Sequence, residues 1–98
     1  MQCPTLGKIK VRTVLQYLLE PIANAYLPIK IPGLEKILTV LEVDGIVRIW
    51  ALVNTESPMV MCEFYTTSSG NPVPSGLEYV GTYASQDDVW HVWYRKAQ

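Results

Sequence analysis

The sequence predicts an all-β or β-rich domain, a single small antiparallel sheet or sandwich of about six or seven strands. Seven prolines and six glycines divide the 98 residues into short segments. Most of these segments alternate apolar and polar residues with the period of two that is typical of strands. Asp44-Gly45 separates two such segments, and this pair favours the type I′ turn of a β-hairpin. We therefore expect that hairpin at the centre of the fold.

Residues 12–17 predict the first strand, because the charged side chains before them alternate with Ile9 and Val11. A helical turn within residues 15–25 is the alternative, since Leu15, Leu18, Leu19 and Ile22 have helical spacing. Pro21 would limit such a helix to its first turn or its end.

Residues 25–31 predict a second strand that contains Pro28, which places it at a sheet edge or on a bulge. Pro32-Gly33 ends this strand. Residues 36–43 and 46–54 flank Asp44-Gly45 and form the expected hairpin. Because residues 46–53 are almost continuously apolar, we expect a central strand that is covered on both faces.

Residues 59–66 predict the next strand, with Val60, Cys62 and Phe64 on one face. Residues 67–76 have no apolar periodicity and exceed the usual hairpin loop, so this loop is expected to be functional or disordered. Two further strands, residues 77–84 and 89–95, close the fold around the turn at residues 85–88.

The length predicts one domain, residues 1–98, in which residues 1–11 are an extension and residues 12–95 form the β core. Apolar residues make up 49% of the chain and charged residues 17%, where about 25% charged is usual. We therefore expect some apolar surface to stay outside the core. This favours a homo-oligomer in which the strand around Trp50 or the strand at residues 90–94 lines a subunit interface.

A net charge of −1 argues against DNA or RNA as a partner, because phosphate contacts need a basic face. No apolar run reaches the roughly 18 residues that span a bilayer, and the N-terminus does not resemble a signal peptide. No membrane partner and a cytoplasmic location are expected. Cys3 and Cys62 are far apart and are expected to be free thiols.

Catalytic and metal-binding signatures are missing from the sequence. The chain has one histidine, His91, and no G-x-S-x-G motif. One histidine with two scattered cysteines does not supply a metal site, and Asp87-Asp88 is typical of a solvated turn. We expect a non-enzyme without a cofactor, in which His91 is a hydrogen-bonded residue on a sheet surface.

Candidate binding residues occur in the long loop and in the apolar strands. The loop residues Ser68, Ser69, Gly70 and Asn71 offer hydroxyl, amide and backbone N–H groups that can hold an anion, although such residues also form ordinary turns. Trp50, Trp90 and Trp93 can stack on a base, or they can be core or interface residues. Arg48 lies among apolar residues and needs a partner such as Glu42 or Glu63.

Several blocks occur in an order that resembles a family of short phage and prophage proteins. They are Gln16-Tyr17, Lys36-Ile37-Leu38-Thr39-Val40, Ile49-Trp50-Ala51-Leu52-Val53-Asn54, Gly70-Asn71-Pro72, Leu77-Glu78-Tyr79-Val80-Gly81-Thr82 and Trp90-His91-Val92-Trp93. The resemblance covers about residues 12–95. The family pattern has G-T-G-H in the loop, where this chain has Ser68-Ser69-Gly70-Asn71.

The resemblance implies a viral origin, a small β-rich fold and a homo-oligomer. By analogy with viral sponges of the Sequestin or Lockin kind, we expect a protein that sequesters a cyclic ADP-ribose-like or cyclic dinucleotide immune signal without cleaving it. It would act in the cytoplasm of the infected bacterial host, with the ligand at or near a subunit interface. A protein-binding inhibitor of a host defence complex and a minor virion or assembly component are the alternatives.

The ligand-binding residues expected under this hypothesis are those of the loop, the tryptophans and the charges near them. They are Ser68, Ser69, Gly70, Asn71, Arg48, Trp50, Trp90, His91, Trp93 and Arg95. His91 is expected to hydrogen-bond the ligand or the loop.

Overall fold

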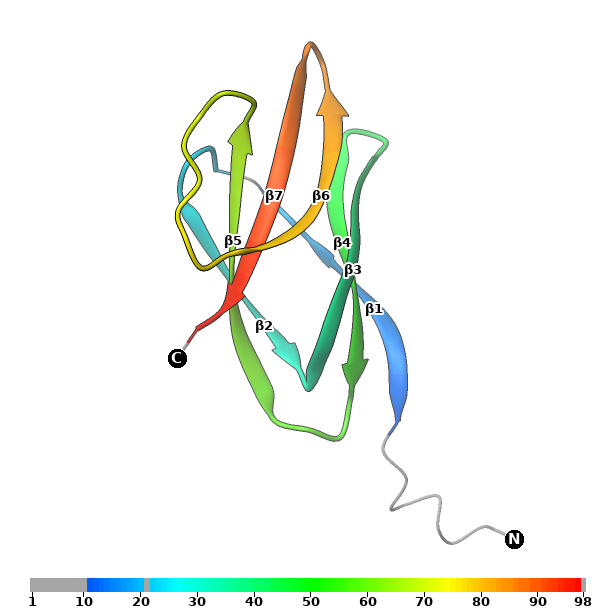
Figure 1. Cartoon of the computed structure of the whole chain (residues 1–98). Coiled ribbons are helices and arrows are strands. Elements are labelled where there is room, and N and C mark those ends of the chain that lie inside the picture. The colour runs from blue at the N-terminus through cyan, green and yellow to red at the C-terminus, as the bar shows by residue number, and fades with distance from the viewer. Residues whose placement is uncertain (1–10, 21, 98) are drawn as a thin grey trace, which may run out of the picture.

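Seven strands form two antiparallel sheets in the computed structural model, which describes residues 11–20 and 22–97 (Figure 1). In chain order the strands are β1 (Arg12–Leu18), β2 (Tyr26–Pro32), β3 (Leu34–Val43), β4 (Ile46–Asn54), β5 (Met59–Ser68), β6 (Glu78–Ser85) and β7 (Asp88–Lys96). The three-stranded sheet has the order β1-β4-β3, and the four-stranded sheet has the order β2-β5-β7-β6. The predicted all-β fold is confirmed.

The Asp44-Gly45 hairpin joins β3 to β4 as the sequence predicts. Asp44 has a φ of 53° and Gly45 a φ of 78°, the paired positive values of a type I′ turn. Val43 pairs with Ile46 beside the turn. At the other end of the chain, β1 pairs with β4 from Arg12 to Leu18, so this segment is a strand and the helical alternative does not occur.

The edge position of β2 follows from its proline. Pro28 has no N–H to donate, and β2 pairs with β5 alone, at the edge of the four-stranded sheet. Only Gly33 separates β2 from β3, although these two strands lie in different sheets. The chain therefore turns a corner at Gly33, whose N–H donates to the carbonyl of Pro58 at 2.9 Å and whose carbonyl accepts from the N–H of Asn54 at 2.9 Å.

The core lies between the two sheets and takes alternate residues from each strand. Ile49, Ala51 and Val53 of β4 are fully buried there, as are Phe64 and Val92 of the facing sheet. The opposite face of β4 is only partly covered, because a sheet in a two-layer structure has one face toward solvent. The prediction that β4 is covered on both faces is therefore wrong, although β4 is central in its sheet.

Apolar side chains gather on the outer face of the three-stranded sheet, which we call the apolar face. Their exposed fractions lie between 40% and 54%, for Val14, Leu18, Leu41, Val43 and Ile46. Cross-strand pairing places them on one side, because Val43 opposes Ile46, and Leu18 and Leu41 both oppose Arg48. The apolar excess of the sequence is therefore concentrated on one sheet surface.

Cys62 is fully buried on the inner side of β5 and is a free thiol. Burial raises the pKa of this thiol, and the charge of Lys96 opposes the rise only in part. We predict that iodoacetamide modifies Cys62 at least about a hundredfold more slowly in the folded chain than in urea, because reaction needs local opening. Mass spectrometry of the Cys62 peptide measures this, and equal rates would contradict it.

The predicted extension, residues 1–11, lies outside the described residues except for Val11, and so does Cys3. The carbonyl of Val11 accepts a hydrogen bond from the N–H of Thr55 at 3.0 Å. Among residues 11–20 and 22–97 there is no helix of the length and apolarity needed to cross a membrane.

Candidate ligand-binding site

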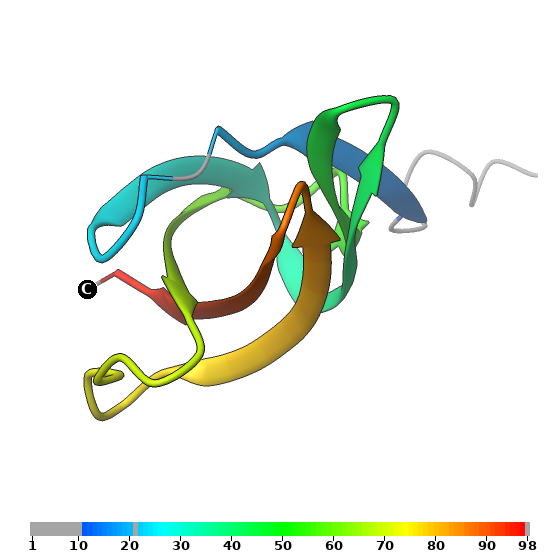
Figure 2. The same cartoon turned by 90° about the horizontal axis from the view of Figure 1, so that it is seen from above.

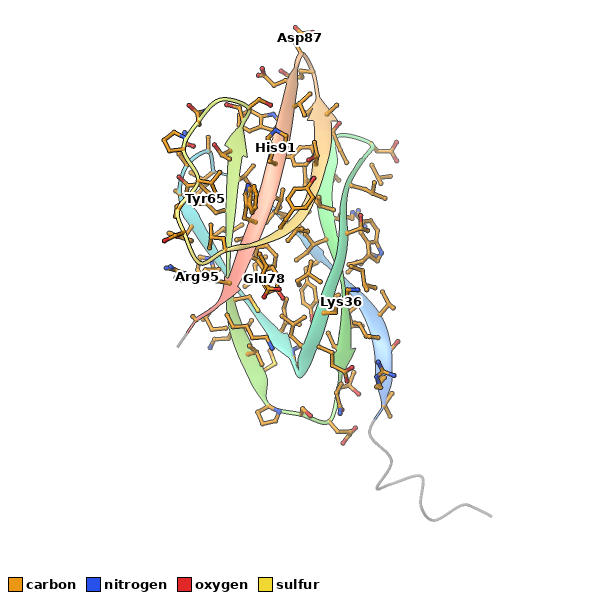
Figure 3. All side chains as sticks on the ribbon, in the orientation of Figure 1. Lys36, Tyr65, Glu78, Asp87, His91 and Arg95 are labelled. Carbon is orange, nitrogen blue, oxygen red and sulfur yellow. The ribbon has the colours of Figure 1, made fainter. Side chains whose placement is uncertain are left out.

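Most of the predicted ligand-binding residues lie together on the outer face of the four-stranded sheet. Alternate residues of β7, namely His91, Trp93 and Arg95, occupy this face. Ser68 ends β5, and Ser69, Gly70 and Asn71 begin the long loop that follows. Figure 3 shows His91 and Arg95 along β7, with Tyr65 on the neighbouring β5.

A chain of hydrogen bonds joins the loop to β7 and β6. Ser69 Oγ lies 2.8 Å from Nε2 of His91, and Thr82 Oγ1 lies 2.9 Å from Nδ1 of the same ring. Tyr79 in turn hydrogen-bonds Thr82 through their hydroxyls. Both ring nitrogens are thus engaged within the protein, so His91 fixes the loop on the sheet.

Ser69 and His91 are at the separation of a nucleophile and its general base. The third group is the hydroxyl of Thr82, whereas a catalytic triad uses a carboxylate that stabilises the imidazolium. Within the described residues no carboxylate hydrogen-bonds His91. The arrangement is therefore better suited to positioning the loop than to acyl transfer.

The loop makes a tight turn at its first residues. Asn71 Nδ2 donates to Ser68 Oγ at 2.7 Å, and the N–H of Asn71 donates to the carbonyl of Ser68 at 3.3 Å. Gly70 has a φ of 90° and faces open space. Ser69, Gly70 and Asn71 are exposed, so their polar groups are accessible to a ligand.

Aromatic rings form a row across the four-stranded sheet. Tyr26, Tyr65, Trp93 and Tyr79 occupy successive strands in register. The Tyr26 and Tyr65 ring centroids are 5.1 Å apart, and those of Tyr79 and Trp93 are 5.2 Å apart. Nε1 of Trp93 is buried without a hydrogen-bond partner among the described residues. The sequence did not predict that these tyrosines belong to the candidate site, because only the strand order brings them beside Trp93.

Arg95 lies at one end of this row. Its Nε donates to Glu63 Oε1 at 2.8 Å, and its guanidinium carbon is 4.2 Å from the ring centroid of Tyr26. The Arg95 side chain remains 42% exposed. The guanidinium is therefore held in place by an ion pair and a cation–π contact, and it still offers N–H groups to solvent.

A pocket of about 330 Å³ lies between the loop and the sheet, and we call it the loop pocket. It is lined by Asn24, Tyr65, Asn71, Pro72, Val73 and Pro74. Asn24 Oδ1 accepts a hydrogen bond from Thr67 Oγ1 at 3.0 Å, which fixes one wall. Tyr65 belongs both to this wall and to the aromatic row, so a ring bound in the pocket would adjoin the row.

The remaining predicted residues, Arg48, Trp50 and Trp90, lie away from this face within one copy of the chain. Arg48 and Trp50 are on the outer side of the three-stranded sheet, and Trp90 packs against the core. Arg48 donates from Nη1 to Gln16 Oε1 at 3.0 Å. The expected ion pair of Arg48 with Glu42 or Glu63 does not form, because these acids bond Ser85 and Arg95 respectively.

No group of three or more His, Cys, Asp or Glu side chains within residues 11–20 and 22–97 is placed to hold a metal ion.

A family model described as "Domain of unknown function (DUF7352)" matches residues 10–98. No curated protein and no solved structure matches the chain.

Proposed function

The chain belongs to the DUF7352 family, and we propose that it binds and sequesters a nucleotide-derived signal without cleaving it. One observation carries the proposal. Neutral hydrogen-bond donors, aromatic rings and one guanidinium converge on the outer face of the four-stranded sheet, beside a pocket. A nucleotide needs these three kinds of group, for its ribose and phosphates, its base and its charge.

The charge of this face favours a ligand with few phosphates. Arg95 is the cation beside the aromatic row, and Glu63 offsets it. Cyclic ADP-ribose derivatives and cyclic dinucleotides carry about two negative charges, which the loop donors and Arg95 can share. The loop groups of Ser69, Gly70 and Asn71 would contact the phosphates or ribose, and Tyr65 and Trp93 would contact a base.

The biological role proposed for this binding rests on the resemblance to phage and prophage proteins. A phage protein that binds an immune signal lowers the free concentration of that signal in the cytoplasm of the infected host. Such a protein needs no chemistry of its own, which agrees with the positioning role of His91. DNA, RNA and membranes are not part of the proposal.

Calorimetric titration of the full chain with cyclic ADP-ribose derivatives and cyclic dinucleotides tests this function. We expect saturable binding with a Kd below about 1 mM for at least one of them. Chromatography of the ligand released by denaturation should recover it unchanged. Failure of every compound to bind, or recovery of a cleaved product, would overturn the proposal.

We further propose that two copies associate through the apolar face. Arg48 lies among the apolar side chains of this surface, opposite Leu18 and Leu41, and its Nε is buried without a hydrogen-bond partner among the described residues. Asp44, at the tip of the β3–β4 turn, lines the same shallow hollow as Arg48. A two-fold arrangement can therefore pair Arg48 of one copy with Asp44 of the other. Each copy keeps its own loop pocket, on the other sheet.

Replacing Ile46 with Lys is expected to shift this association toward the monomer by at least about tenfold in Kd, because it places like charges within an apolar contact. Met59→Lys is the matched control, since Met59 is 58% exposed and lies outside the apolar face. Sedimentation equilibrium measures both. A wild-type chain that stays monomeric at all concentrations would refute self-association and favour a host protein as the partner of this face.

A further inference from the structure

A second pocket, of about 660 Å³, is built between the two sheets at the end of the molecule where the β3–β4 and β6–β7 turns lie, and we call it the end pocket. Figure 2 looks onto this end, and Asp87 marks the tip of the β6–β7 turn in Figure 3. Its walls are Leu18, Leu19, Glu20, Ala23, Glu42, Gly45, Ile46, Val47, Thr66, Tyr83, Ser85, Gln86, Asp88 and Trp90. Trp90 is the one wall residue that the sequence singled out for ligand binding.

The charge of the end pocket is negative. Its walls carry the carboxyl groups of Glu20, Glu42 and Asp88, and they include no Lys, Arg or His from the part of the chain that the structure describes. Glu42 is half-buried and held in place, because Ser85 Oγ donates to its Oε2 at 2.7 Å. The floor is apolar, with Leu19 and Val47 almost fully buried. The pocket therefore disfavours phosphate groups.

Tyr83 provides an observation that is independent of these acids. It is only 7% exposed and lines the pocket, and its hydroxyl makes no hydrogen bond to any described residue. Burial, and then the negative charge of Glu42, raises the pKa of this hydroxyl above its usual range. The hydroxyl is not among the fully buried polar atoms that lack a partner, so it is accessible from the pocket and free to form a hydrogen-bonded contact there. This contact can be supplied by a ligand.

We propose that the end pocket binds an organic cation, an ammonium or guanidinium group on an apolar stem. The carboxylates of Glu42 and Asp88 would attract the charge, and Tyr83 would supply a hydrogen-bonding oxygen and, with Trp90, a π-face. The stem would lie against Leu19 and Val47. This ligand class is opposite in charge to the nucleotide of the loop pocket, so the two sites are chemically distinct.

Two probes separate the sources of such a cation. Spermidine represents a free polyamine, and the tripeptide amide Gly-Arg-Gly represents a basic side chain of a protein. Saturable binding of spermidine or of the peptide by the full chain at low salt supports the proposal. The probe that binds with the lower Kd indicates whether the natural cation is a free polyamine or a protein side chain. Triethylene glycol, a neutral analogue, should not bind. Absence of saturable binding of both cations below about 10 mM would overturn the proposal.

Variants test the location of the site. Glu42→Gln is expected to weaken cation binding by about tenfold or more, because a charge-assisted contact is lost. Tyr83→Phe should weaken it by several-fold while keeping the buried ring in place. Glu56→Gln is the matched control, since it removes the same charge from an exposed position in the β4–β5 turn. If Glu42→Gln and Glu56→Gln weaken cation binding equally, the proposal is overturned, because the cation is then attracted by the net charge of the protein and not by the end pocket.

Discussion

Replacing Arg95 with Gln is expected to weaken the binding of a phosphate-bearing ligand at the loop pocket by at least about tenfold, because a charge-assisted contact is lost. The substitution also leaves Glu63 without its cation, so the local charge becomes negative. Glu63→Gln should have the opposite effect and strengthen binding several-fold, since it frees the Arg95 guanidinium and removes a repulsive charge. Calorimetry with the tightest cyclic nucleotide measures both effects.

Changes in folding do not explain such a pair of results. The Arg95 and Glu63 side chains are 42% and 28% exposed, and a solvent-screened pair of this kind contributes at most about 1 kcal/mol to stability. Arg48→Gln removes the same charge from the three-stranded sheet and should leave the affinity unchanged. If Arg95→Gln and Arg48→Gln weaken binding equally, or if Glu63→Gln also weakens it, the ligand does not bind beside Arg95.

The candidate ligand-binding site could be predicted from the sequence only for the residues of one strand and one loop. Alternation along residues 89–95 places His91 and Trp93 on the same face, and the length of the loop at residues 67–76 predicts that it is functional or disordered. The contribution of Tyr26, Tyr65 and Tyr79 was not predictable, because it depends on the order β2-β5-β7-β6. Arg48 lies on the three-stranded sheet, which also depends on the strand order. Its neighbour Gln16 comes from β1, which pairs with β4 over a separation of 32 residues.

The strands themselves were predictable because local chemistry decides them. Asp44-Gly45 specifies its own turn, and Pro28 specifies an edge. The division of the seven strands between two sheets depends on long-range pairing, which no local sequence pattern predicts. The sequence marks Pro32-Gly33 as the end of a strand, yet it does not indicate that β3 continues at once in the other sheet.

That corner leads to the largest expected change in stability, the effect of Gly33→Ala. Gly33 has a φ of 46°, a left-handed conformation that residues with a Cβ rarely adopt. A Cβ there would also collide with the backbone carbonyl of Asn54 and would lie 2.7 Å from Cβ of Ser57. Because Asn54 is itself fixed by its hydrogen bond to Gly33, the backbone has little room to move away. Strain and overpacking together are expected to lower the free energy of unfolding by about 4 kcal/mol.

Thermal unfolding separates the collision from the conformational cost. For a domain of this size, the Gly33→Ala change corresponds to a fall in Tm of about 15 °C or more. Gly45→Ala is the matched control, because Gly45 also has a positive φ, of 78°, but its Cβ would meet nothing within 4 Å. Gly45→Ala should lower the free energy of unfolding by only about 1 kcal/mol. Equal losses at the two positions would mean that the close approach of Gly33 to Asn54 does not hold the two sheets together at this corner. A much larger loss of stability for Gly33→Ala than for Gly45→Ala would show that the chain can pass directly from β2 in one sheet to β3 in the other only with a glycine at this contact.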